Sequence, residues 1–234
     1  MYKDYKISAP YFEFGPKAYL WGEKLLELAL VIDAAAQKYD VDVLLTPQYT
    51  DIPLMAANMK RVHVYAQHVD PLVPGRGLGS VLPEAVKAAG AVGTMLNHAE
   101  KKLDLPTIDA TIRRCDEVGL ATIVCADTLD ELTAIAKMSP NLIVAEPTAL
   151  IGTGTPSSMD YVRDTIKTVR DINPDIIVLQ GAGISKPEDV YNVIMAGADA
   201  TGCTSGIIKA PDPKKMADDM LHALRAAWDE RHRA

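Results

Sequence analysis

Glu146 directly ends an apolar run of the sequence, Asn141–Ala145, and begins a loop, Pro147–Gly154, that has glycines at one end. A carboxylate that stands at the edge of an apolar region is a candidate general base. The loop behind it is a candidate lid over a bound molecule. Other polar side chains that follow apolar runs are Lys17, Gln67, His68, Asn97, His98, Glu100 and Cys125. These side chains are the candidates for acid and base chemistry.

Glycine-rich loops follow three of the apolar runs near the C-terminal end of the sequence. They contain Gly152 and Gly154, then Gly181–Ser185, and then Thr204–Gly206. Exposed backbone N–H groups in such loops can surround a phosphate without any basic side chain. Together with the candidate base, the loops predict a small phosphorylated substrate.

Short apolar runs of β type alternate with longer segments of helical period along the whole chain. The runs expected to form strands are Lys6–Phe14, Val41–Thr46, Val62–Gln67, Ala91–Leu96, Ala121–Cys125, Leu142–Ala145, Ile176–Gln180 and Ala198–Cys203. The segments expected to form helices are Tyr19–Lys38, Ile52–Met59, Leu82–Ala89, Leu105–Val118, Leu129–Met138, Ser158–Asp171, Pro187–Ala196 and Pro213–Ala227. The sequence therefore predicts eight strand–helix units.

Strict alternation of strands and helices predicts a parallel sheet, because each helix returns the chain to the start of the next strand. Eight such units favour a closed (β/α)8 barrel, an α/β fold in one domain over residues 1–234. Nearly continuous apolar strands such as Asp175–Leu179 suit burial on both faces. An open doubly wound sheet is the alternative, but the first strand is followed by no Gly-x-Gly-x-x-Gly sequence. In a barrel, all the candidate side chains lie at the C-terminal ends of the strands.

Composition excludes several classes of protein. The chain has 31 acidic and 24 basic residues, a net charge of −7, and no basic cluster that would follow a nucleic acid backbone. Its apolar runs are short, and residues 1–6 lack the apolar stretch of a signal peptide, so we expect no membrane contact. The cysteines, Cys115, Cys125 and Cys203, are odd in number and form no Cys-x-x-Cys pair. We therefore expect neither a disulfide framework nor a metal site, and a cytoplasmic protein.

Each candidate side chain also has a purely structural interpretation. Glu146 can be a salt-bridged strand end, His98 a buried histidine, and Lys17 a solvated lysine. Cys125 and Cys203 fit core thiols, and the glycine-rich loops can be tight turns.

Several stretches carry a resemblance to a known family: Asn97–Glu100, Ala145–Pro147 with Leu150–Gly154, Gly181–Ser185, and Thr204–Gly206. They resemble the fourth-, sixth-, seventh- and eighth-strand motifs of the triosephosphate isomerases. The chain is most similar to the short archaeal branch of that family, which also has stretches like Tyr65–Pro71 and Leu82–Val86. The resemblance runs in order from about residue 17 to residue 213. It implies the TIM barrel fold and a homo-oligomer, either a homodimer or, as in the archaeal branch, a homotetramer.

The resemblance also implies a role for each candidate. Glu146 would move a proton between two carbons of a sugar phosphate, and His98 would polarise the carbonyl. Lys17 would bring a positive charge to the substrate, and Glu100 would hold this network. Phosphate contacts would come from Gly152, Gly181, Ala182, Gly183, Ser205 and Gly206. The reaction needs no metal or organic cofactor.

The sequence departs from the family pattern on one side of the expected site. The lysine of the family belongs to an Asn-x-Lys motif, but here the residues are Gly15-Pro16-Lys17. Leu78 stands near the place of a threonine that crosses the dimer interface, and Ala99 replaces a serine. The base, the electrophile and the phosphate loops are kept, while the polar floor beside the substrate is changed.

These departures leave three functions open. The first is triosephosphate isomerase itself, which interconverts glyceraldehyde 3-phosphate and dihydroxyacetone phosphate. The second is an isomerase of a larger sugar phosphate, such as a tetrulose phosphate, in a pocket enlarged at Gly15. The third is a barrel without activity that only binds a phosphorylated metabolite. Such a protein would not need a base.

Overall fold

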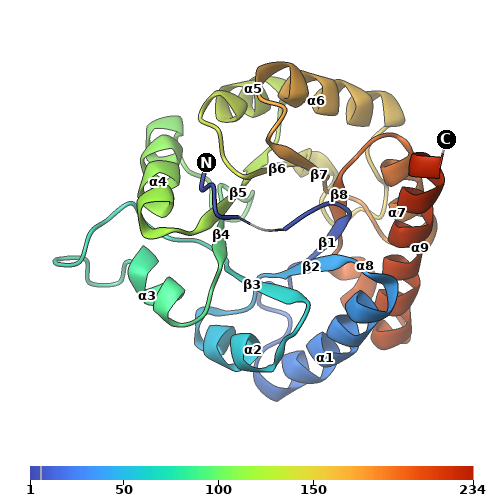
Figure 1. Cartoon of the computed structure of the whole chain (residues 1–234), viewed down its shortest axis with the longest axis horizontal. Helices are drawn as coiled ribbons and strands as arrows, with labels where there is room; N and C mark the ends of the chain where they lie inside the picture. The colour runs from blue at the N-terminus through green and yellow to red at the C-terminus, as the bar shows by residue number, and fades with distance from the viewer. Residues whose placement is uncertain (6, 234) are drawn as a thin grey trace.

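The computed structural model describes residues 1–5 and 7–233 as a ring of parallel strands enclosed by helices (Figure 1). The strands are β1 (Tyr11–Phe14), β2 (Asp42–Leu45), β3 (Val62–Ala66), β4 (Gly93–Leu96), β5 (Ala121–Ala126), β6 (Leu142–Ala145), β7 (Ile177–Gln180) and β8 (Ala200–Gly202). Each strand pairs in parallel with the next, and β8 pairs with β1 to close the barrel. The predicted single-domain (β/α)8 barrel is therefore confirmed.

Helices cover the outside of the strands (Figure 1). They are α1 (Gly22–Tyr39), α2 (Ile52–Asn58), α3 (Pro83–Ala88), α4 (Leu105–Val118), α5 (Leu129–Lys137), α6 (Met159–Ile172), α7 (Pro187–Met195), α8 (Ser205–Ile208) and α9 (Pro213–Arg233), with 3₁₀ turns at Tyr49–Asp51 and Thr148–Leu150. Three of them begin at polar caps, because Asp104, Thr128 and Ser158 accept hydrogen bonds from N–H groups of the first turn. The capping residues thus fix where these three helices begin.

Side chains of the strands alternate between two apolar layers. In β1, Tyr11 joins the cluster inside the barrel, whereas Phe12 and Phe14 join the layer between strands and helices. The inner cluster also contains Leu44, Tyr65, Ile123, Leu142, Leu179 and Ala200. By this alternation Glu13 faces the inside, near the C-terminal end of the barrel.

Three predicted boundaries differ from the structure, and one helix was not predicted. The first strand begins at Tyr11, because Pro10 has no N–H for the ladder, and Lys6 lies outside the described residues. The first helix begins at Gly22, because the preceding residues form a turn in which the Tyr19 N–H donates to the Pro16 carbonyl. The short α8 was not predicted, and α9 continues past Ala227. The remaining predicted ends lie within two residues of those observed.

The segment between β3 and α3 extends away from the barrel (Figure 1). Its apolar residues Val73 and Leu78 are exposed. Within residues 1–5 and 7–233, no helix combines the length and the apolar character needed to cross a bilayer.

Candidate active site

A cavity of about 590 Å³ opens at the C-terminal ends of the strands. The predicted site residues that line it are Lys17, His98, Glu100, Glu146, Gly152, Gly181, Ala182, Gly183 and Ser205. Gly206 is outside this lining and packs against Ser185. Asn97, another polar residue after a strand, is buried, and its amide donates to the Cys125 carbonyl and the Glu131 carboxylate. Asn97 therefore holds the loop and does not face the cavity.

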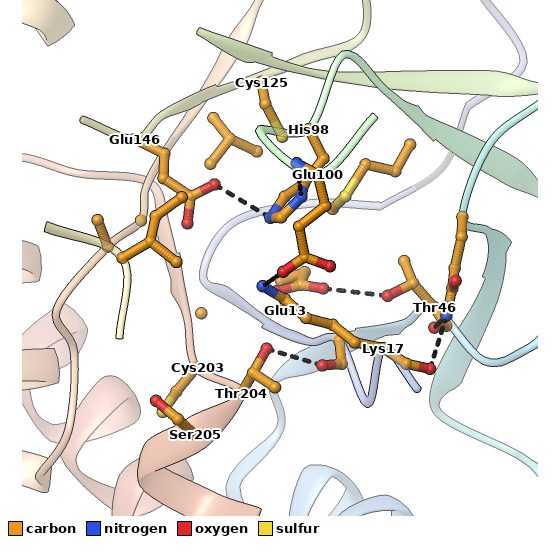
Figure 2. Close-up of a pocket in the computed structure, with 18 of the residues that line it drawn as sticks. Glu13, Lys17, Thr46, His98, Glu100, Cys125, Glu146, Cys203, Thr204 and Ser205 are labelled. Atoms are coloured by element: carbon orange, nitrogen blue, oxygen red, sulfur yellow. Dashed lines mark hydrogen bonds and ion pairs between the residues drawn. The ribbon is translucent and has the colours of Figure 1, made fainter. Parts of the chain in front are cut away.

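His98 and Glu146 point toward each other within the cavity (Figure 2). His98 follows β4 and Glu146 follows β6, and their Nε2 and Oε2 atoms are 3.6 Å apart. Each side chain is only 16% exposed. The two groups thus face a common space that a small molecule can enter.

The proton on the His98 ring is fixed by a backbone contact. The Glu100 N–H donates to Nδ1 of His98 at 3.1 Å, so the hydrogen of the neutral ring is on Nε2. Burial lowers the pKa of His98, and the positive charge of Lys17 lowers it further. A neutral imidazole that presents Nε2–H to the cavity is suited to donate a hydrogen bond to an oxygen of a ligand.

The surroundings of Glu146 make it a stronger base than an exposed glutamate. Burial raises the pKa of Glu146, while the charge of Lys17 and a hydrogen bond from the Ala182 N–H lower it. Its own N–H donates to the Ala126 carbonyl at 2.9 Å, which fixes the chain where it leaves β6. Glu146 therefore has a fixed position and an increased affinity for a proton.

Lys17 lies in a turn that two side chains hold in place. Its backbone has a φ of +50°, which is uncommon for a residue with a side chain. Its carbonyl accepts hydrogen bonds from the amides of Gln48 at 2.7 Å and Gln67 at 3.1 Å. Its ammonium donates to Oε1 of Glu100 at 2.7 Å. These contacts direct the positive charge into the cavity beside His98 (Figure 2).

The loops after β6 and β7 meet on the other side of the cavity. Ala182 and Gly183 have φ values of +65° and +72°. A side chain at Gly183 would collide with the carbonyl of Thr155, so only glycine permits this contact. Ser205 begins α8 next to this loop. Backbone of the loops after β6, β7 and β8 therefore lines one end of the cavity.

The loop after Glu146 is anchored at its beginning and exposed further on. The Thr148 N–H donates to the Asp127 carboxylate at 2.7 Å, and the Thr153 hydroxyl donates to the Leu150 carbonyl at 2.9 Å. Residues 152–155 are exposed, and Gly152 lines the cavity. An exposed segment held mainly at its ends is of the kind that opens locally at small free-energy cost.

Sequence reasoning missed Glu13, which lies on the floor of the cavity. The Thr46 hydroxyl donates to Oε1 of Glu13 at 3.3 Å (Figure 2). Burial and the negative charge of Glu146 raise the pKa of Glu13 to about 8. The signal in the sequence was a glutamate at an inward position of an aromatic strand, Tyr11–Phe14.

The cysteines and the acidic groups form no metal site or disulfide in the described structure. Cys115, Cys125 and Cys203 are free and buried. Among residues 1–5 and 7–233, no group of three or more His, Cys, Asp or Glu side chains has the arrangement of a metal site.

Comparison with known families decides between the possible kinds of barrel. The model of the triosephosphate isomerase family matches residues 17–220. The chain belongs to the triosephosphate isomerase family. The predicted family and enzyme class, an aldose–ketose isomerase, are thereby confirmed. The match begins at Lys17 and does not include Glu13 or Gly15.

Named triosephosphate isomerases resemble the chain over most of its length. The enzyme of Methanobacterium bryantii is 40% identical over 206 residues, which are 87% of this chain and 91% of that protein. The enzyme of Methanocaldococcus jannaschii is 37% identical over 203 residues, 86% of this chain and 92% of the relative. These relatives are archaeal, as the resemblance of the motifs implied.

The fold of a triosephosphate isomerase from a bacterium is also similar. The crystal structure of the Bartonella henselae enzyme superimposes with a TM-score of 0.77 at 15% sequence identity, covering 93% of this chain and 99% of that one. At this identity the likeness shows the barrel of the triosephosphate isomerases and not the details of the site.

Proposed function

We propose that this member of the family interconverts dihydroxyacetone phosphate and glyceraldehyde 3-phosphate, with Glu146 as the base and His98 as the electrophile. The observation that carries the assignment is their convergence, with Nε2 and Oε2 3.6 Å apart in a largely buried space. A base and a hydrogen-bond donor on either side of one carbonyl carbon are what proton transfer between neighbouring carbons requires.

The Glu146 carboxylate removes a proton from C1 of dihydroxyacetone phosphate. The electrons of the C1–H bond form the C1–C2 double bond, and those of the C2 carbonyl move to its oxygen. His98 Nε2–H donates to that oxygen and stabilises the enediolate. After a proton passes between the two oxygens and the acidic hydrogen of Glu146 exchanges with solvent hydrogen, the Glu146 carboxyl donates a proton to C2, and the aldehyde forms at C1. Burial, which raises the pKa of Glu146, favours the proton-abstraction step.

Other lining residues support this chemistry by their charge and position. Lys17 places a cation beside the oxygens on which negative charge develops, and Glu100 orients both Lys17 and the His98 ring. The phosphate is assigned to the opposite end, at Gly152, Gly181, Ala182, Gly183, Ser205 and Gly206. The loop Pro147–Gly154 is the proposed lid, which excludes water while the enediolate exists.

The alternative of a larger sugar phosphate rested on an enlarged pocket at Gly15. A Cβ at that position would lie 2.7 Å from Oε1 of Glu13, so the Glu13 side chain already fills the space. Leu78, the other departure, is exposed and does not line the cavity. The structural argument for a longer substrate is therefore weakened, and the triose is the substrate that we propose.

We further propose that residues 1–234 act as one domain of a cytoplasmic homo-oligomer, a homodimer or a homotetramer. The exposed Val73 and Leu78 in the segment after β3 offer apolar surface for contact with a second copy. No metal or cofactor is assigned, because Glu146, His98 and Lys17 account for each proton and charge in the reaction. We also propose that the Gly15-Pro16-Lys17 motif is a departure from the Asn-x-Lys motif of the family.

Steady-state kinetics of the full chain test the proposal. The substrates are glyceraldehyde 3-phosphate, dihydroxyacetone phosphate and a panel of four- to six-carbon sugar phosphates, with Glu146→Gln as the blank. We expect turnover of both trioses far above the blank and none of the longer sugars. Turnover of a longer sugar with the trioses at the blank level would refute the proposed substrate. Absence of turnover for every sugar phosphate of the panel would refute the enzymatic function.

A further inference from the structure

The side chain of Glu13 occupies space that its neighbours leave for it. Glu13 pairs in register with Leu44 on one side and Gly202 on the other. A Cβ at Gly15 would lie 2.7 Å from Oε1 of Glu13, and one at Gly202 would lie 2.9 Å from Oε2. Side chains at positions 15 and 202 are thus incompatible with the carboxyl where it is. Two glycines in the lining of the cavity make room for one glutamate.

The two oxygens of the Glu13 carboxyl have different surroundings. Oε1 accepts a hydrogen bond from the hydroxyl of Thr46, a buried residue that directly follows β2. Oε2 lies toward Gly202, and both residues line the cavity. With Thr46 as the donor to Oε1, the hydrogen of the protonated carboxyl is on Oε2. This O–H is available to a bound molecule.

The titratable groups that surround Glu13 come from several strands. Lys17 follows β1 and Glu146 follows β6, while the thiol of Cys125 comes from β5 and that of Cys203 follows β8. Burial raises the pKa of both thiols, that of Cys203 to about 11, so they stay uncharged near neutral pH. With a pKa raised to about 8 by burial and by Glu146, the Glu13 carboxyl holds its proton at pH 7.

The depth of Glu13 decides which end of the substrate it meets. Glu13 belongs to the strand itself, whereas the residues assigned to the phosphate stand in the loops that follow β6, β7 and β8. Beside Glu13 are Lys17 and Thr46, on the floor of the cavity (Figure 2). A molecule with its phosphate in the loops therefore brings its other, reacting end to this floor.

We propose that Glu13 is a substrate-contacting residue whose carboxyl donates a hydrogen bond to an oxygen at the reacting end of the triose phosphate, where position 15 offers no side chain. This inference rests on the proposed function. The contact replaces the Asn side chain that the family motif has at position 15, where this chain has glycine. The floor of the cavity thereby gains a hydrogen-bond donor that is present only while the Glu13 carboxyl is protonated. Ionisation of Glu13 would remove the donor and add a negative charge next to the enediolate.

The test compares the wild-type chain with Glu13→Gln and Glu13→Leu in kcat/KM for both trioses, from pH 6 to pH 9.5. Glu27→Gln, on the exposed face of α1, is the matched control. We expect Glu13→Leu to lose about 10²-fold in kcat/KM at pH 7, as when a donor to a developing oxyanion is removed. Inhibition of Glu13→Leu by inorganic phosphate should stay unchanged, because it depends on the loops assigned to the phosphate.

The pH profile of Glu13→Gln distinguishes a substrate contact from a structural role. Wild-type kcat/KM falls as the pH rises through about 8, the pKa of Glu13. The amide of Glu13→Gln still donates but does not titrate, so this variant keeps activity within about tenfold at pH 7 and lacks that fall. The profile decides the question even if Glu13→Leu does not fold.

Three outcomes count against the inference. An unchanged kcat/KM in folded Glu13→Leu, or the same alkaline fall in Glu13→Gln as in the wild type, overturns it while leaving the proposed function intact. A wild-type chain that turns over neither triose overturns the proposed function and this inference together.

Discussion

The two sides of the cavity obtain their polar groups in different ways. On the side of β4 and β6, His98 and Glu146 stand in loops just beyond the strands. On the side of β1, Glu13 lies within the strand and faces the interior. Residues in loops can be exchanged with little effect on packing. A carboxyl inside the barrel needs neighbours that fit it, here Gly15 and Gly202.

The largest effect is expected on the β6 side, from Glu146→Gln. The amide has the shape of the carboxyl but cannot accept the substrate proton, so kcat should fall about 10³- to 10⁴-fold. Stopped-time assays in both directions measure this, and thermal unfolding checks that the barrel is intact. A loss smaller than that of Glu13→Leu would reverse the proposed ranking of the two sides.

His98→Leu should have the next largest effect, because it removes the Nε2–H donor. We expect kcat to fall about 10²- to 10³-fold, the usual cost of losing one donor to an oxyanion. Lys102 also brings positive charge near His98, and its ammonium donates to the Glu131 carboxylate at 3.0 Å, so Lys102→Gln is a control for the local charge that also removes this ion pair. Comparable losses in both variants would mean that charge and not the donor matters.

A smaller effect, now on stability, is expected on the β1 side from Gly15→Ala. The new methyl group would meet Oε1 of Glu13 at 2.7 Å, so the free energy of unfolding should decrease by roughly 1–3 kcal/mol. In a Glu13→Ala background the same change should cost much less, since the carboxyl is gone. Chemical denaturation of the four chains measures the coupling. Equal costs in both backgrounds would show that the two positions are independent.

The smallest effect is a dependence of stability on pH. Glu13 has a pKa of about 8 in the folded chain and near 4.5 when unfolded, so the folded state holds a proton that the unfolded state releases between these values. The free energy of unfolding therefore falls as the pH rises over this range. Glu13→Gln does not titrate and should gain roughly 2 kcal/mol over the wild type between about pH 6 and pH 8. A constant difference over this range would contradict the raised pKa of Glu13.

The barrel was predictable because apolar periodicity repeats in every unit of the chain. The strand ends were predicted within two residues except at the first strand, where Pro10 lacks the N–H of a ladder. The four-residue α8 was too short to produce a periodic pattern.

The candidate site was predictable only where its residues follow strands. Glu146, His98 and Lys17 were found by that position, and the structure brings them around one cavity. Glu13 was missed, because the inward side of a strand is defined only once the barrel has closed. Gly15 was interpreted as an opening in the pocket, but the space belongs to the Glu13 side chain, which lies two residues away in sequence.

The most direct test of proton transfer by Glu146 is the incorporation of solvent hydrogen during turnover. Dihydroxyacetone phosphate is incubated with the full chain in D₂O, and deuterium at C2 of the glyceraldehyde 3-phosphate formed is followed by NMR. The account predicts deuterium at C2 with the wild type, and loss of both isomerisation and exchange with Glu146→Gln. Isomerisation without deuterium at C2, or at an undiminished rate in Glu146→Gln, would contradict it.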